Sequence, residues 1–161
     1  MNPAELDSAI GLFFLAWRAF TAGRDRELGA LGLGQVHHRL LFLLARMPAL
    51  SVGSLAATLG ISRQALHRPL RELLERGFVQ SNVAGHSGRE RALMLTATGR
   101  TLEQRATATQ HELLGPVLAR VGLQASRGWL QVMRELAQGP MQELPPAVAA
   151  WARPGNAPKA G

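Results

Sequence analysis

The stretch VGSLAATLGISRQALHRPLRELLERGFVQSNVAGHSGRERALML, residues 52–95, decides the fold of this 161-residue chain. Apolar residues recur first at helical spacing and then alternate, and a glycine separates the two helical segments. The pattern predicts two helices, at about 52–59 and 62–76, followed by two strands of a hairpin, at about 78–83 and 91–95. Two helices joined by a tight turn, with a hairpin directly after them, form a helix-turn-helix with a β-wing.

The second of these helices is predicted to have one apolar and one basic side. Ser62 is a typical N-cap. On a helical wheel, the leucines at 66, 70, 73 and 74 fall on one side, opposite Gln64, His67, Arg68, Arg71 and Glu75. A helix of this kind fits the DNA major groove, so we expect base-edge contacts from Gln64, His67, Arg68 and Arg71, and a backbone contact from Arg63. The alternative is an ordinary helical hairpin with a solvated charged face.

The hairpin supplies a second basic element. Arg89 and Arg91 lie beside the predicted tip, Gly85 to Gly88, where positive side chains suit the phosphate backbone or the minor groove. A plain surface turn is the alternative for this segment alone. Together the elements predict a mainly α fold with a small β-hairpin wing.

Helices are also predicted on both sides of this stretch. Residues 3–22 show helical spacing and hold four of the eight aromatic residues, and glycines from Gly23 onward break that pattern. Residues 35–47 are mostly apolar, with an unbroken apolar run from Leu40 to Ala45, which predicts a central buried helix. Thr96 is expected to cap a long helix that Gly115-Pro116 kinks or splits, before a last helix at about 126–137.

Composition narrows the class of protein. The formal net charge is +7, and 17 of the 18 basic residues are arginine, whose planar fork suits phosphates and guanine edges. A GC-rich genome, whose codons favour arginine, is another source of that ratio. The chain has no cysteine, which excludes disulfides and thiolate chemistry. No apolar run is long enough to span a membrane, and Glu5 and Asp7 are unlike the start of a signal peptide, so we expect a cytoplasmic protein.

The chain resembles the MarR family of bacterial winged-helix regulators over roughly residues 5–138. The resemblance is carried by Leu-Ala-x-x-Leu-Gly-Ile-Ser at 55–62, Leu-x-x-x-Gly-Phe-Val at 73–79 and Leu-Thr-x-x-Gly at 95–99. Two positions depart from the family pattern. Ser87 stands where the wing commonly has an aspartate two residues before its arginine, and Glu90 is a possible substitute. Pro69 stands inside the recognition helix, where we expect it to kink the helix and re-aim Arg63 and Gln64.

The resemblance implies a homodimer that binds a pseudo-palindromic operator in double-stranded DNA and acts as a repressor. By this reading residues 1–30 form an N-terminal dimerisation helix, 31–98 the DNA-binding lobe and 99–140 the C-terminal dimerisation helices, with a flexible tail at 141–161. Members of the family often release DNA when a small aromatic acid or phenol binds. The candidate ligand-binding residues are Phe13, Trp17, Arg18, His37, His38 and Arg46. The alternative is that the aromatic residues form the dimer core and Arg18 is solvated.

Other classes of function find less support. No pair of histidines is spaced i, i+4, and His37 and His38 point about 100° apart on a helix, so no metal site is predicted. Phosphate-cradling loops, paired carboxylates and nucleophile elbows are missing, so we expect neither catalytic residues nor a cofactor. Two rival functions stay open: a winged-helix module that docks a protein partner without binding specific DNA, and an RNA-binding regulator.

Overall fold

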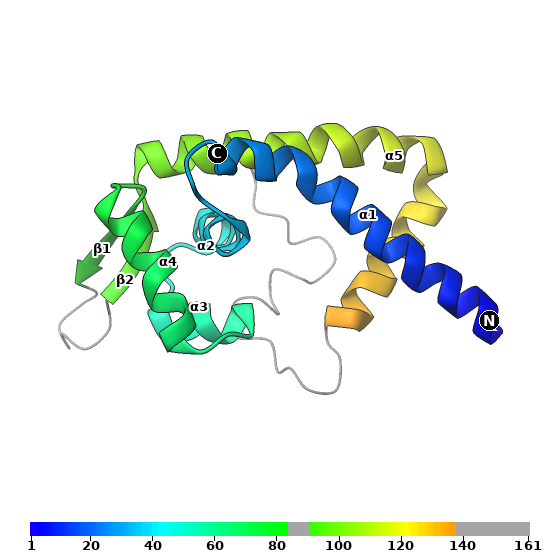
Figure 1. The fold of residues 1–161 in the computed structure, drawn as a ribbon, viewed down its shortest axis with the longest axis horizontal. Coiled ribbons are helices and arrows are strands. Elements are labelled where there is room, and N and C mark those ends of the chain that lie inside the picture. The colour runs from blue at the N-terminus through cyan, green and yellow to red at the C-terminus, as the bar shows by residue number, and fades with distance from the viewer. Residues whose placement is uncertain (84–90, 138–161) are drawn as a thin grey trace.

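The computed structural model describes residues 1–83 and 91–137, and shows five helices and one hairpin in those residues (Figure 1). The elements, in chain order, are α1 (Pro3–Gly29), α2 (Gln35–Arg46), α3 (Val52–Leu59), α4 (Arg63–Glu75), β1 (Val79–Val83), β2 (Arg91–Leu95) and α5 (Ala97–Ala137). The predicted fold class, a mainly α protein with a β-hairpin wing, is confirmed. The expected flexible tail at 141–161 lies outside the described residues.

Local capping explains where most helices begin and end. Asn2 and Glu5 form a reciprocal capping box, in which each side chain accepts a hydrogen bond from the other's backbone amide, at 3.0 and 2.8 Å. The Ser62 hydroxyl accepts the amide of Ala65 at 3.1 Å and so caps α4 as predicted. Gly60 ends α3 in the left-handed conformation, with φ of 63°, which permits the tight turn into α4.

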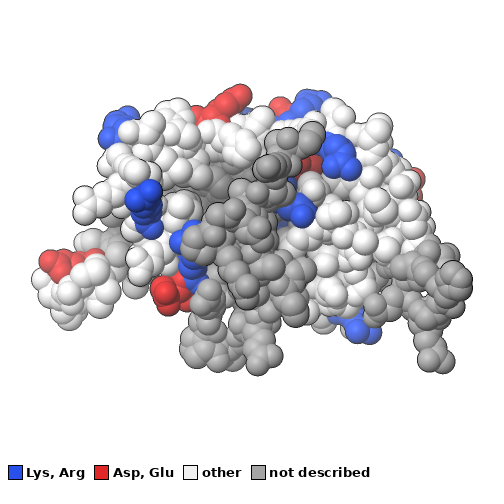
Figure 2. Space-filling view, turned by 180° about the vertical axis from the view of Figure 1, so that it is seen from behind, with Lys and Arg blue, Asp and Glu red and all other residues white. Residues whose placement is uncertain are grey.

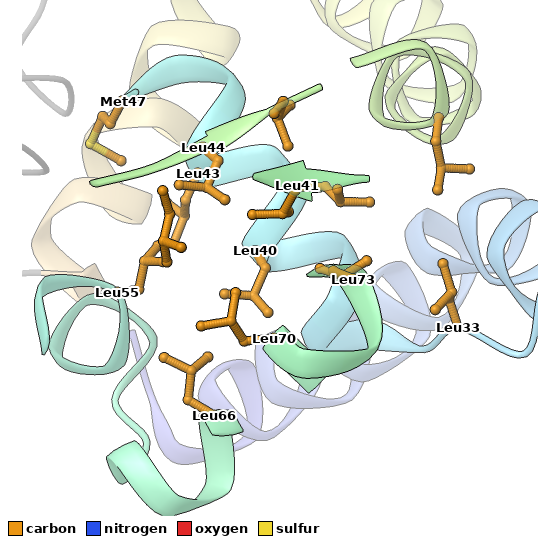
Figure 3. Close-up of a cluster of buried hydrophobic side chains, with 14 of the residues drawn as sticks. Leu33, Leu40, Leu41, Leu43, Leu44, Met47, Leu55, Leu66, Leu70 and Leu73 are labelled. Carbon is orange, nitrogen blue, oxygen red and sulfur yellow. The ribbon is translucent and has the colours of Figure 1, made fainter. Parts of the chain in front are cut away.

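The core is built around α2. Leu40, Leu41 and Leu44 are essentially excluded from solvent. Figure 3 shows Leu40 of α2 facing Leu70 and Leu66 of α4, while Leu55 of α3 reaches the same cluster. These contacts hold α3 and α4 on one side of α2, with β2 and α5 also against it. The prediction of a central buried helix at 35–47 is therefore confirmed.

The hairpin joins the lobe to α5 through Thr96. β1 and β2 pair antiparallel, with Val79 opposite Leu95 and Val83 opposite Arg91. The Thr96 hydroxyl donates to the carbonyl of Gly77 at 2.6 Å and accepts the amide of Gly99 at 3.0 Å. The same side chain therefore caps α5, as predicted, and ties its first turn to the start of β1. A Cβ at Gly99 would overlap the carbonyl oxygen of Phe78, so only glycine permits this approach.

Two of the predicted helix breaks are wrong. α1 continues through Gly23 to Gly29, because Gly23 lies against α5: a Cβ there would come within 2.8 Å of the Cβ of Thr109. This glycine serves helix packing instead of ending the helix. In α5 the non-helical residue is Gly122, with φ of 81°, and the helix runs through Gly115-Pro116. The turn of α5 at this place is visible in Figure 1.

The predicted kink at Pro69 finds no support in the backbone. Pro69 lies within a single continuous α4, from Arg63 to Glu75. A proline removes one helical hydrogen bond, here the one its amide would donate to the carbonyl of Ala65. The burial of Leu66, Leu70 and Leu73 on the core side holds the helix together around that missing bond.

The joint at Gly99 makes a first prediction. Gly99→Ala should lower the free energy of unfolding by more than 2 kcal/mol, on the order of an overpacked core position, because the new methyl group meets backbone and not a flexible side chain. Denaturant titration followed by circular dichroism measures this. The matched control is Gly128→Ala, also in α5 but with no atom within 4 Å of the added Cβ, which should be neutral or gain up to about 1 kcal/mol in helix propensity. Equal stability of the two variants would contradict the assigned packing.

Candidate nucleic-acid interface and effector cavity

The helix α4 exposes the side chains that the sequence analysis assigned to DNA. Leu66, Leu70 and Leu73 are buried against the core. All five candidates of this helix are exposed: Arg63, Gln64, His67, Arg68 and Arg71. The structure therefore brings these five together on one outward face. Figure 2 shows the molecule from the side opposite to Figure 1, where the visible basic side chains are scattered and form no continuous patch.

Two of these arginines are paired with acids one turn further along α4. Arg68 Nε donates to Glu72 Oε1 at 3.0 Å. The hydrogen bond from Arg68, and then one from His37, hold the pKa of Glu72 below its usual range. Arg71 and Glu75 are 3.6 Å apart and both are more than half exposed, so this second pair is loose. Arg71 can therefore turn toward a phosphate or base at little cost.

The wing is only partly described. Arg89 and the tip at 85–88 lie outside the described residues. Arg91 is the first residue of β2 and pairs with Val83, which places it at the outer end of the hairpin. The assignment of both arginines to DNA stays a prediction.

A cavity of about 330 Å³ opens between α1, α2, α3 and α5. Aromatic and cationic side chains form much of its wall. The lining residues are Trp17, Phe20, Arg24, His38, Arg39, Phe42, Leu43, Thr58, Leu59 and Gln110. Trp17 and Phe20 stack at a tilt with ring centres 6.2 Å apart, and the guanidinium of Arg39 lies 6.0 Å from the Trp17 ring. Its size and composition suit one small aromatic molecule with an anionic group.

Arg24, His38 and Gln110 are the buried polar residues of this wall. Arg24 is 3% exposed and pairs with Asp25 at 2.6 Å. His38 is 5% exposed, and its Nε2 atom has no hydrogen-bond partner among the described residues. Burial lowers the pKa of His38 from 6.5 to about 4, and the charges of Arg24, Arg46 and Arg39 act in the same direction, while Asp25 opposes them. His38 is therefore neutral near pH 7, with a polar atom free for a ligand.

Of the six candidate ligand-binding residues, the structure places two on this wall, Trp17 and His38. Phe13 and Arg18 are exposed on α1 away from the lining. His37 faces α4, where it hydrogen-bonds Glu72. Arg46 lies over the Phe42 ring and donates to Glu103 of α5 at 2.7 Å, so its charge is already used in a buried pair.

Sequence reasoning missed Arg24, Phe20, Arg39 and Gln110. Arg24 lies two turns after Trp17 on the same side of α1, but it falls beyond a helix that is predicted to end before Gly23. Gln110 comes from α5, whose position against α1 no local pattern reports. The spacing of seven residues between Trp17 and Arg24 was thus the feature of the sequence from which Arg24 could have been predicted.

An apolar surface remains uncovered at the other end of the protein. None of the first twenty residues is buried, although α1 carries large apolar side chains there. The exposed ones in α1 and α5 include Leu6, Ile10, Phe13, Phe14, Trp17, Leu113, Val117, Val121, Trp129, Leu130 and Leu136. Exposed apolar area of this extent on two neighbouring helices marks an interaction surface.

Metal sites and membrane spans are the two remaining classes of feature. Residues 1–83 and 91–137 hold no group of three or more histidine and acidic side chains that could bind a metal. In the same ranges no helix combines the length and the apolar character that crossing a membrane requires.

Comparison with known proteins is consistent across sequence and structure. A model of the MarR family matches residues 31–90. The HTH-type transcriptional regulator PetP of Rhodobacter capsulatus is 36% identical over 136 residues, which cover 84% of this chain and 82% of that protein. A MarR-family regulator from Silicibacter pomeroyi has the same fold, with a TM-score of 0.72 and 23% identity over 89% of this chain and 99% of its own. The Mycobacterium tuberculosis protein Rv2887, solved in complex with salicylic acid, has a TM-score of 0.55 and 30% identity over 78% of this chain and 93% of its own.

The buried histidine makes a prediction about pH. In the unfolded chain His38 titrates near 6.5, and in the folded protein near 4, so its contribution to stability is complete above pH 6.5 and is lost as the pH falls toward 4. The loss is at most about 3 kcal/mol. Urea unfolding between pH 4 and 7 should therefore show a flatter pH dependence for His38→Gln than for the parent. His111→Gln, which alters an exposed histidine of α5, should keep the parent's pH dependence, and a parent-like curve for His38→Gln would contradict the assignment.

Proposed function

Because the chain belongs to the MarR family of transcriptional regulators, we propose that it binds duplex DNA sequence-specifically as a homodimer and represses transcription. We further propose that a small aromatic acid or phenol in the cavity between α1 and α2 releases the DNA. The observation that carries the DNA-binding function is the exposure of five polar and basic side chains on one face of α4, with leucines anchoring the opposite face.

The roles of these side chains follow from their chemistry. Arg68, Arg71, Gln64 and His67 are proposed to read base edges, since arginine suits guanine and glutamine suits adenine in the major groove. Arg63, at the start of α4, is proposed to bind a phosphate together with the helix N-terminus. Arg89 and Arg91 of the wing are proposed to bind the backbone or the minor groove.

The uncovered apolar surface supports the homodimer. A second copy of the chain would bury the aromatic first half of α1 and the last part of α5. Two copies related by a twofold axis would present two α4 helices, which matches a pseudo-palindromic operator.

The cavity supports control by a small molecule. A carboxylate can pair with Arg39, or with the Nη1 group of Arg24, whose Nε and Nη2 atoms donate to Asp25, while the ring of the ligand lies against Trp17 and Phe20. Some relatives have been solved with ligands of this class, among them Rv2887 with salicylic acid. The proposed ligand contacts Arg24, which is buried in the cavity wall, and not Arg18, which is exposed outside the lining.

DNA binding is tested by selecting binding sites from a pool of randomised duplexes and measuring fluorescence anisotropy on the selected site across a salt series. A dimer that neutralises about eight phosphates should give a log–log slope near −7. Arg71→Ala should relax base preference, whereas Arg89→Ala should weaken all duplexes and flatten the slope. Arg26→Ala, an exposed arginine of α1, serves as the control and should change neither. Weak, salt-insensitive binding by the parent would instead favour a protein-interaction module.

Effector binding is tested with salicylate as the probe, by isothermal titration calorimetry. Arg24→Gln should weaken salicylate binding at least tenfold, because it removes a buried cation from the cavity wall. Arg18→Gln is the matched control, because it removes the same charge from the same helix outside the lining, and it should bind salicylate like the parent. Equal loss in both variants would show that net charge, and not the cavity, determines binding.

A further inference from the structure

Glu72 is the one acid of α4 that another helix holds in place among the described residues. Its Oε1 atom accepts from Arg68 Nε at 3.0 Å, and its Oε2 atom accepts from His37 Nε2 of α2 at 2.8 Å. Both oxygens of the carboxylate are thus engaged, one within α4 and one from the neighbouring helix. The Arg71–Glu75 pair lacks such a bond from α2 and is longer, at 3.6 Å.

The protonation of His37 follows from its second hydrogen bond. The backbone amide of Gly34 donates to His37 Nδ1 at 3.0 Å. A backbone amide can only donate, so Nδ1 carries no proton and the proton of the neutral ring is on Nε2. His37 is therefore a donor to Glu72, and its side chain, 11% exposed, is fixed from both sides.

The consequence lies in the position of Arg68. Its side chain is 83% exposed, and an exposed pair within one helix does not by itself fix a long side chain. With Glu72 held from α2, the Arg68 Nε atom has a fixed partner, and because the bond to Glu72 runs through Nε, the two Nη groups are left for other partners. Those two groups are what a bidentate contact with guanine uses.

We propose that His37 is a positioning residue for base reading: it fixes Glu72, and Glu72 fixes Arg68 in the orientation that contacts a base. This inference rests on the proposed DNA-binding function and adds a residue that touches no DNA itself. It also distinguishes the two arginines of α4 that pair with acids, because Arg68 is held in place before DNA binds and Arg71 is not.

Two substitutions of His37 distinguish a role of its hydrogen bond to Glu72 from a role of its side-chain volume. The amide nitrogen of Gln can reach the place of Nε2, so His37→Gln keeps a donor for Glu72. His37→Asn keeps a polar atom only near the place of Nδ1 and loses the donor. Arg68→Ala identifies the base pair that Arg68 reads, as the position of the selected site where discrimination is lost. Glu72→Gln removes the charged acceptor directly and provides a second route to the same result.

At that base pair the parent should discriminate against a changed base by about tenfold or more. His37→Asn and Glu72→Gln should reduce this ratio to below about threefold, whereas His37→Gln should stay within about twofold of the parent. The salt slope of His37→Asn should equal the parent's, since no phosphate contact is lost. A general loss of structure would instead weaken every duplex and lower the melting temperature.

The outcomes separate the two claims. A parent that selects no binding site overturns the proposed function, and this inference with it. A parent that selects a site, whose base preference His37→Asn and Glu72→Gln both retain, overturns the inference alone. So does an Arg68→Ala variant with undiminished discrimination at every position.

Discussion

Leu40, Leu41 and Leu44 of α2 are excluded from solvent, and the elements around them take their positions from that burial. α4 rests on α2 through Leu66 and Leu70, and β2 and α5 also lie against α2. A close-packed helix does not deform gradually, so movement on one side of α2 requires repacking on the others. Both α4 and the cavity therefore depend on the same buried helix.

Several arginines of this protein form ion pairs with carboxylates. The net charge of +7 predicts affinity for nucleic acid, yet Arg24, Arg46 and Arg68 each pair with a carboxylate. Arg46 and Glu103 form a partly buried pair that joins α2 to α5, and Thr107 donates to the same carboxylate oxygen at 2.6 Å. Because the loss of hydration offsets much of the attraction, a pair of this kind adds little net stability. The charges that remain exposed on α4 are the ones available to a partner.

Local signals predicted most of the fold, because caps, turns and the leucine pattern of α4 act over a few residues. Ser62, Gly60 and Thr96 were assigned from sequence and have those roles in the structure. The errors concern one contact between distant segments, at Gly23, and two prolines inside helices, Pro69 and Pro116. From local sequence Gly23 predicts a helix end, whereas in the structure it lies inside α1 against α5. Pro116 predicts a break in α5, whereas the non-helical residue is Gly122. For the same reason the exposed face of α4 could be predicted, whereas the cavity wall, drawn from four helices, could be predicted only in part.

His37 and His38 occupy successive positions in α2, and their side chains leave the helix in different directions. One reaches the carboxylate of Glu72 on α4, and the other lies in the wall of the cavity. Since successive residues of a helix are rotated by about 100°, a single insertion or deletion between His38 and Leu40 would rotate both rings relative to the buried leucines at once. The register of the two histidines to the core of α2 is thus constrained by two separate contacts. Evolutionary change in this segment should proceed by substitution and not by change of length.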